Sequence, residues 1–118
     1  MAQHNDTGKM GEDLAARYLQ EKGYQVLERN YRHQQSEIDL IAKKDKMLLF
    51  VEVKTRSNLS FGNPEEFVSY TKVKLIKRAA EHYIYAKDWH FDVRFDVVAV
   101  SVSPAGTPVV KHIEDAFY

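Results

Sequence analysis

The chain has 118 residues with 44% hydrophobic side chains, no cysteine, and 17 basic against 17 acidic residues, so its formal net charge is zero. This composition suits one globular domain, and the lack of cysteine excludes disulfides, thiolate zinc sites and thiol catalysis. The balanced charge argues against a protein that coats nucleic acid by bulk charge, but it permits a local basic surface. The polar start is not a signal peptide and the apolar runs are too short for a membrane span, so we expect a cytoplasmic protein without a membrane partner.

Hydrophobic periodicity predicts two helices and four or five strands along the chain. In chain order they are a helix over about residues 7–22, strands at 24–29, 37–42 and 47–54, a helix over about 71–85, a strand at 93–102 and a short edge strand at 108–111. Loops or turns are expected at 30–35, 43–46, 57–63 and 104–106, and residues 63–66 have the pattern of a helix start. This order predicts an α/β sandwich around a mixed sheet.

The two predicted helices have recognisable ends and buried faces. Asp6 or Thr7 can cap the first helix and Gly23 can end it. Glu12 projects toward the edge of the buried face of this helix. The second helix is expected to bury four residues at helical spacing: Ile76, Ala79, Ala80 and Tyr83.

Two acidic residues and a lysine interrupt the second and third predicted strands. With a two-residue loop at 44–45, or a four-residue loop in the same register, Asp39 lies opposite Phe50 and Glu37 lies opposite Glu52. Because side chains alternate between faces, Asp39, Glu52 and Lys54 then emerge on one face, with Asp39 diagonal to Glu52. A three-residue loop would instead place the two carboxylates on opposite faces.

Carboxylates placed in this way suit a divalent-metal site that hydrolyses a phosphodiester. Mg²⁺ prefers oxygen ligands and keeps several waters, so Asp39, Glu52 and a substrate phosphate are sufficient, with the Val53 carbonyl as a further candidate ligand. A metal ion stabilises phosphate charge and activates bound water, and Lys54 can orient that water or meet the developing charge. The competing interpretation is an ordinary ion pair on a solvated sheet face, and the pattern alone leaves both open.

The same residues carry a resemblance to a known family. The runs SEIDLIA, from Ser36 to Ala42, and FVEVKTR, from Phe50 to Arg56, together resemble the motif of the PD-(D/E)XK nuclease superfamily. Within it the chain looks like the small bacterial UPF0102 (YraN-like) family, whose fold is akin to that of archaeal Holliday junction resolvases. Further matches are GE at 11–12, FGNPE at 61–65 and RFDVVAV at 94–100, so the resemblance covers about residues 8–117.

The resemblance implies a restriction-endonuclease-like fold: one domain over residues 1–118 with three layers, in which a mixed central sheet is flanked by helices. It implies that Asp39 and Glu52 bind Mg²⁺ or Mn²⁺, that Lys54 is the catalytic lysine, and that Glu12 is an auxiliary acid. Ser36 stands where the family usually has glycine. Serine fits there only if the backbone is extended and does not adopt a positive φ.

Basic residues close to this motif are candidates for contacts with nucleic-acid phosphates. Arg32 precedes the acidic strand, Arg56 follows the lysine, and Lys72 lies near the start of the second helix. A solvated surface is the alternative interpretation for each of them.

Other polar residues are expected to have structural or surface roles. Asp96 lies inside a predicted strand, where we expect it to be hydrogen-bonded or paired with Arg94 or another base. The five histidines show no zinc-site spacing and are expected at the surface.

Two functions from different classes are compatible with the sequence. The first is a metal-dependent endonuclease acting on DNA, including branched or structured DNA, with a homodimer suggested by analogy to junction resolvases. The alternative is a nuclease-fold adaptor that binds nucleic acid or a protein partner without cutting it. The joint presence of Asp39, Glu52 and Lys54 favours the enzyme, since a degenerate fold often loses one of the three.

Overall fold

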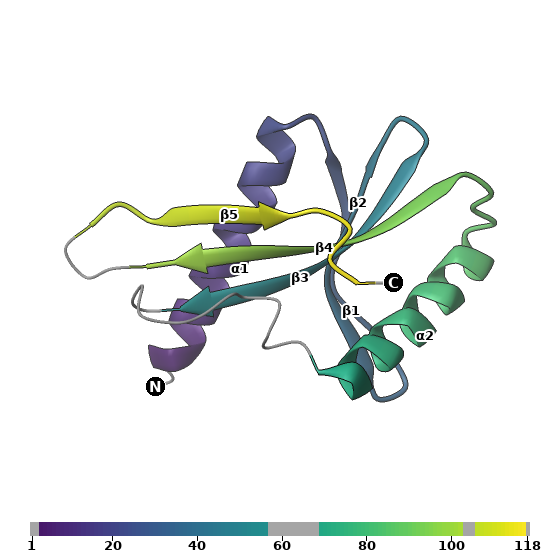
Figure 1. Ribbon diagram of the computed structural model, residues 1–118, viewed down its shortest axis with the longest axis horizontal. Coiled ribbons are helices and arrows are strands. Elements are labelled where there is room, and N and C mark those ends of the chain that lie inside the picture. Colours follow the sequence, from purple (N-terminus) through teal and green to yellow (C-terminus); the bar gives the residue numbers. More distant parts are fainter. Residues whose placement is uncertain (1–2, 57–68, 103–105, 118) are drawn as a thin grey trace.

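In the computed structural model the described residues form a five-stranded sheet with one helix on each face (Figure 1). The structure describes residues 3–56, 69–102 and 106–117, with side chains from residue 8 onward. The elements are α1 (Gln3–Glu21), β1 (Gln25–His33), β2 (Ser36–Lys44), β3 (Met47–Arg56), α2 (Tyr70–Ala86), β4 (Asp92–Ser101) and β5 (Val109–Ile113). The strands lie in the order β1-β2-β3-β4-β5, and β3 and β4 are parallel while the other neighbours are antiparallel. The predicted mixed sheet is therefore confirmed.

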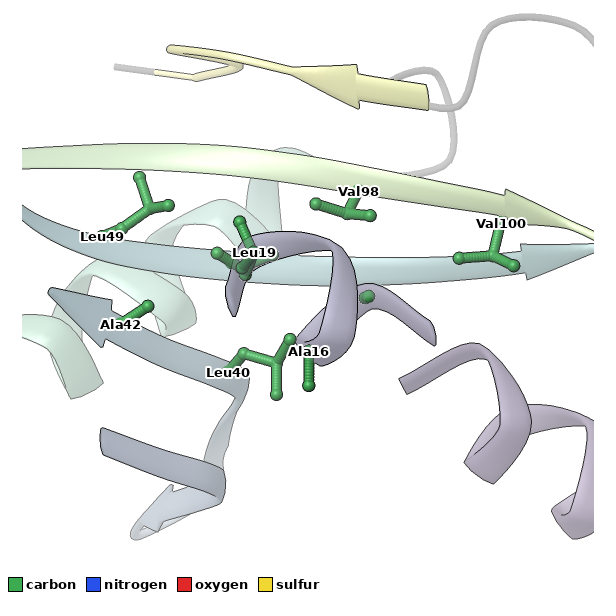
Figure 2. Packing of buried hydrophobic residues seen from close by; sticks show 9 residues of the cluster. Ala16, Leu19, Leu40, Ala42, Leu49, Val98 and Val100 are labelled. Atoms are coloured by element: carbon green, nitrogen blue, oxygen red, sulfur yellow. The ribbon is translucent and has the colours of Figure 1, made fainter. Parts of the chain in front are cut away.

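The two helices cover opposite faces of the sheet, because side chains along β3 alternate between two hydrophobic clusters. Leu49 and Val51 pack in the cluster under α1, whereas Leu48 and Phe50 pack in the cluster under α2. Figure 2 shows α1 lying over β2, β3 and β4, with Ala16, Leu19, Leu40, Ala42, Leu49, Val98 and Val100 between them. The α2 side of the core contains the four helix residues that the sequence predicts: Ile76, Ala79, Ala80 and Tyr83. Three layers with a mixed central sheet agree with the restriction-endonuclease-like fold.

The ends of several elements differ from the sequence-based boundaries. Helix α1 begins at Gln3, so Asp6 and Thr7 lie inside it and are not its cap, whereas Gly23 ends it with a φ of 94°. The loop predicted at 30–35 is wrong, because β1 continues to His33 through Asn30, whose φ is 54°. Asparagine tolerates this left-handed conformation better than most residues, so the strand continues through it. The predicted helix start at 63–66 lies outside the described residues.

The register between β2 and β3 differs from the predicted one by two residues. Lys44 pairs with Met47, so the turn consists of Asp45 and Lys46 and not of residues 44–45. Asp45 has a φ of 52°, a conformation that aspartate tolerates in turns, which allows β2 to extend one residue further than expected. Because the error is an even number, every side chain keeps its predicted face, and Asp39 stays on the face of Glu52.

Asp96 is fully buried and is the centre of a polar network at β4 and β5. Its two carboxylate oxygens accept hydrogen bonds from Arg94 Nε at 2.9 Å and Nη2 at 2.8 Å, and from the backbone N–H of Asp115 at 3.0 Å. His112 Nε2 lies 2.6 Å from Asp96 Oδ2, and His112 Nδ1 lies 3.2 Å from the hydroxyl of Tyr18. Burial opposes ionisation of Asp96, but these hydrogen bonds outweigh it and lower its pKa. The expected pairing with Arg94 is confirmed, while a surface position for His112 is wrong, because only 4% of its side chain is exposed.

None of the helices in the described part of the chain is long and apolar enough to cross a membrane.

Candidate active site

Strands β2 and β3 stop pairing at the point where the acidic residues lie. Their last backbone pair is Leu40 with Val51. Beyond this pair the backbone N–H of Val53 donates a hydrogen bond of 2.7 Å to Asp39 Oδ2, so a carboxylate holds the end of β3. If the register is continued by one step, Asp39 lies directly across from Glu52. The two carboxylates are therefore neighbours across the strands and not diagonal as predicted.

Glu52 is almost completely buried, and a single oxygen of its carboxylate lies close to two ammonium groups. Glu52 is 4% exposed. Its Oε2 lies 3.6 Å from Lys54 Nζ on the same strand and 2.5 Å from Lys72 Nζ on α2. The Lys54 side chain is 14% exposed and the Lys72 side chain is 44% exposed. Two lysines from different elements thus lie beside one buried acid.

The environment of Asp39 disfavours a negative charge in the absence of a bound cation. Burial is the main cause, and the charges of Glu52 and Glu12 add to it, so the pKa of Asp39 rises to about 7. The hydrogen bond from Val53 N–H and the charge of Lys72 offset only part of this effect. A partly buried acid with a strongly raised pKa beside a second acid marks a candidate functional site.

The pKa values of Lys54 and Lys72 shift in opposite directions. Burial and repulsion from Lys72 lower the pKa of Lys54, although Glu52 attracts its charge. Burial also acts to lower the pKa of Lys72, but the hydrogen bond and charge of Glu52 outweigh it, so this pKa rises. Lys54 is therefore the lysine whose proton is held less tightly.

The donor set fits a hard divalent cation with few protein ligands. Asp39 and Glu52 offer carboxylate oxygens, and the carbonyl of Val53 belongs to the residue whose N–H holds Asp39. Within the described residues there is no group of three or more His, Cys, Asp or Glu side chains that could hold a metal ion. Such a cation would therefore need water or phosphate oxygens as well, which is how Mg²⁺ is usually bound.

Glu12 lies on α1 near this site but makes its own contacts. Its Oε1 accepts a hydrogen bond from Asn30 Nδ2 at 3.2 Å and lies 3.8 Å from Arg29 Nη2. Glu12 acts on Asp39 through charge, since it contributes to the raised pKa of that residue. The structure therefore places Glu12 within electrostatic reach of Asp39 and does not pair it with Glu52.

Gly11 allows α1 to approach the end of β3 closely. The sequence pattern alone does not predict this close approach. A Cβ atom at this position would lie 1.9 Å from Thr55 Oγ1 and 2.9 Å from Thr55 Cβ. The signal that could have found it is an isolated glycine inside an amphipathic helix, next to an acid of the site.

We expect Gly11→Ala to destabilise the protein by about 1–3 kcal/mol, because a methyl group forced into this contact must move α1 or Thr55. Gly8→Ala is the matched control in the same helix, since a Cβ there has nothing within 4 Å. The control should stabilise the protein by up to ~1 kcal/mol through helix propensity. Urea denaturation of both variants measures the difference, and equal midpoints would contradict the close approach.

The three basic residues predicted to contact phosphates lie in different surroundings. Arg32 is exposed, with its Nε 3.6 Å from Glu37 Oε2. Arg56, at the end of β3, donates to the carbonyl of Thr55 at 3.0 Å. Lys72 is bound to Glu52, so it belongs to the acidic site itself. Lys72 therefore contacts an acid of the candidate site directly, which its interpretation as a phosphate contact does not include.

A cleft of about 320 Å³ opens beside these residues, between the β1–β2 turn and the start of α2. Asp39, Ser36 and Lys72 are among the residues that line it. Ser69 caps α2 by accepting a hydrogen bond from the N–H of Lys72 at 3.1 Å, which fixes where the lysine leaves the helix. Ser36 lies in β2 and is not among the residues with positive φ, so serine fits where glycine was expected.

The model of the Uncharacterised protein family UPF0102 matches residues 11–100, which include every residue of the site. The chain belongs to this family. UPF0102 proteins from Flavobacterium psychrophilum and Christiangramia forsetii are 47% and 46% identical to it, over all of this chain and 98% of each relative. A UPF0102 protein from Chloroherpeton thalassium is 51% identical, with 93% of this chain and 92% of the relative covered. These UPF0102 relatives cover both strands that carry the acidic pair.

Proposed function

We propose that this UPF0102 protein is a metal-dependent endonuclease that hydrolyses DNA phosphodiester bonds, and that it belongs to the PD-(D/E)XK superfamily. The observation that supports the proposal best is the partly buried Asp39 carboxylate beside the buried Glu52, where burial and the charge of Glu52 disfavour the ionised form of Asp39 and a cation would favour it. Lys54 is the third residue that this chemistry requires, and its ammonium lies 3.6 Å from Glu52.

Each residue of the site has a distinct proposed task. Asp39 and Glu52 would hold Mg²⁺ or Mn²⁺, with the Val53 carbonyl as a further ligand. When bound, the ion supplies charge stabilisation for the phosphate and activates a water for attack. Lys54, whose ammonium lies 3.6 Å from Glu52, would orient the attacking water or stabilise the charge that develops on the phosphate. Glu12 contributes charge at the edge of the site.

Arg32, Arg56 and Lys72 are proposed to contact the phosphates of the DNA, with the cleft beside Asp39 as the entrance. The net charge of zero means that affinity depends on these local contacts and falls as salt is added. A homodimer would bring two such basic surfaces together, and sedimentation of the protein with and without DNA tests that part of the proposal.

The direct test is cleavage of four DNA substrates by highly purified protein: a four-way junction, a flapped duplex, a linear duplex and a single strand. We expect cutting of at least one substrate with Mg²⁺ or Mn²⁺ and none with EDTA, and branched DNA is the substrate that the junction-resolvase likeness favours. If the protein binds these substrates but cuts none, it is an adaptor that kept the fold without the activity.

A further inference from the structure

Lys72 occupies the place beside Glu52 that a positive ion would take. Its Nζ lies 2.5 Å from Glu52 Oε2, closer than Lys54 Nζ at 3.6 Å, although Lys54 is on the same strand as the acid. Lys72 is also the more exposed of the two lysines, with 44% of its side chain accessible against 14% for Lys54. Lys72, the nearer of the two lysines to Glu52, is therefore also the one whose side chain can move away more easily.

The carboxylate of Glu52 already has two positive neighbours while no metal ion is bound. The ammonium groups of Lys54 and Lys72 both lie near the same Glu52 oxygen. A divalent ion on that oxygen would meet an ammonium group already in place, and like charges at such short range repel strongly in a partly buried site. One lysine must move for the ion to enter.

Lys72 has a route out of the site, and Lys54 does not. The backbone of Lys72 is held by the Ser69 cap, while its long flexible side chain borders the 320 Å³ cleft at the start of α2. An ammonium released from Glu52 can turn into this cleft and stay hydrated. Lys54 lies on β3 where this strand is still paired with β4, and only 14% of its side chain is accessible.

We propose that Lys72 is an exchangeable placeholder for the divalent cation: it neutralises Glu52 in the metal-free protein and is displaced into the cleft when the ion binds. The inference rests on the proposed metal site and adds a function for α2. The position of the Lys72 side chain, in the first turn of this helix, would then depend on whether a metal ion is bound. In the loaded state the released ammonium lies where a DNA phosphate would enter, so that metal loading makes Lys72 available to substrate.

The first test is binding of Mn²⁺ alone, measured by calorimetry without DNA. Lys72→Met removes the competing charge and keeps the length of the side chain, so we expect it to bind Mn²⁺ about tenfold more tightly than the wild type. Lys74→Met is the matched control on the same helix, because Lys74 Nζ lies over the ring of Tyr70. This control and Lys72→Arg, which keeps the charge, should each bind within about twofold of the wild type.

The second test follows the Lys72 amine itself in the wild-type protein. Brief acetylation followed by peptide mass spectrometry should show that saturating Mn²⁺ raises the reactivity of Lys72 several-fold and leaves that of Lys74 unchanged. If Mn²⁺ binds the wild type but neither the affinity of Lys72→Met nor the reactivity of Lys72 changes, the exchange is refuted and the metal site stands. If neither the wild type nor Lys72→Met binds Mn²⁺, the metal site and the exchange are both refuted.

Discussion

Lys54→Ala is expected to reduce DNA cleavage by about 10³-fold while Mn²⁺ binding stays close to that of the wild type. The ammonium of Lys54 lies 3.6 Å from Glu52. Lys54 is not one of the residues proposed to bind the metal ion. Its removal takes away charge stabilisation at the phosphate and leaves both carboxylates in place. Cleavage rates on the substrate that the wild type cuts best, together with calorimetric Mn²⁺ binding, measure the two effects separately.

Asp39→Asn provides the contrasting result, since it should lose both cleavage and metal binding. Lys46→Ala is the control for loss of one positive charge, because Lys46 lies in the turn at the opposite end of β3, with its Nζ over the ring of Phe91. This control should cut like the wild type. If Lys54→Ala lost Mn²⁺ binding together with activity, Lys54 would be a counterion that holds the carboxylates and not a catalytic residue.

The face on which the site lies could be predicted because it depends only on alternation along strands. Asp39, Glu52 and Lys54 share a side whenever the turn between their strands has an even number of residues, and the observed turn has two. The register itself could not be predicted in the same way. It depends on which residue takes the left-handed turn conformation, and Asp45 competes for this position with neighbours of similar polarity.

Contacts between elements that are far apart along the chain could not be predicted from the sequence. The buried face of α2 could be predicted from its 3.6-residue periodicity, but not the distance at which the helix would lie from β3. For this reason Lys72 was expected at DNA phosphates, while the structure places its ammonium on Glu52. The buried position of His112 was missed for a related reason, because β5 must lie beside β4 before this histidine can reach Asp96.

Metal affinity should rise by about 30-fold between pH 5.5 and pH 8, because Asp39 must lose its proton before it can act as a ligand. Burial and the charges of Glu52 and Glu12 raise the pKa of Asp39 to about 7, so below this pH each unit reduces the fraction of ionised Asp39 about tenfold. Calorimetric titration with Mn²⁺ at several pH values measures this dependence. A constant affinity across the range would contradict the shifted pKa.

The same pKa predicts the opposite pH dependence for the metal-free protein. Asp39 has a folded-state pKa above its ordinary value of 3.8, so the folded state binds more protons than the unfolded state between about pH 4 and pH 7. The contribution of Asp39 to the free energy of unfolding therefore decreases as pH rises through this range, and the decrease ends above pH 7.

Asp39→Asn cannot ionise at this position and should lack this contribution. Thermal melts of the two metal-free proteins should therefore diverge as pH rises, with the wild type losing more stability. Saturating Mn²⁺ should restore stability to the wild type most strongly at pH 8, where Asp39 has lost its proton and the cation takes its place. A loss of stability between pH 4 and pH 7 that saturating Mn²⁺ abolishes would identify Asp39 as a group that exchanges its proton for a metal ion.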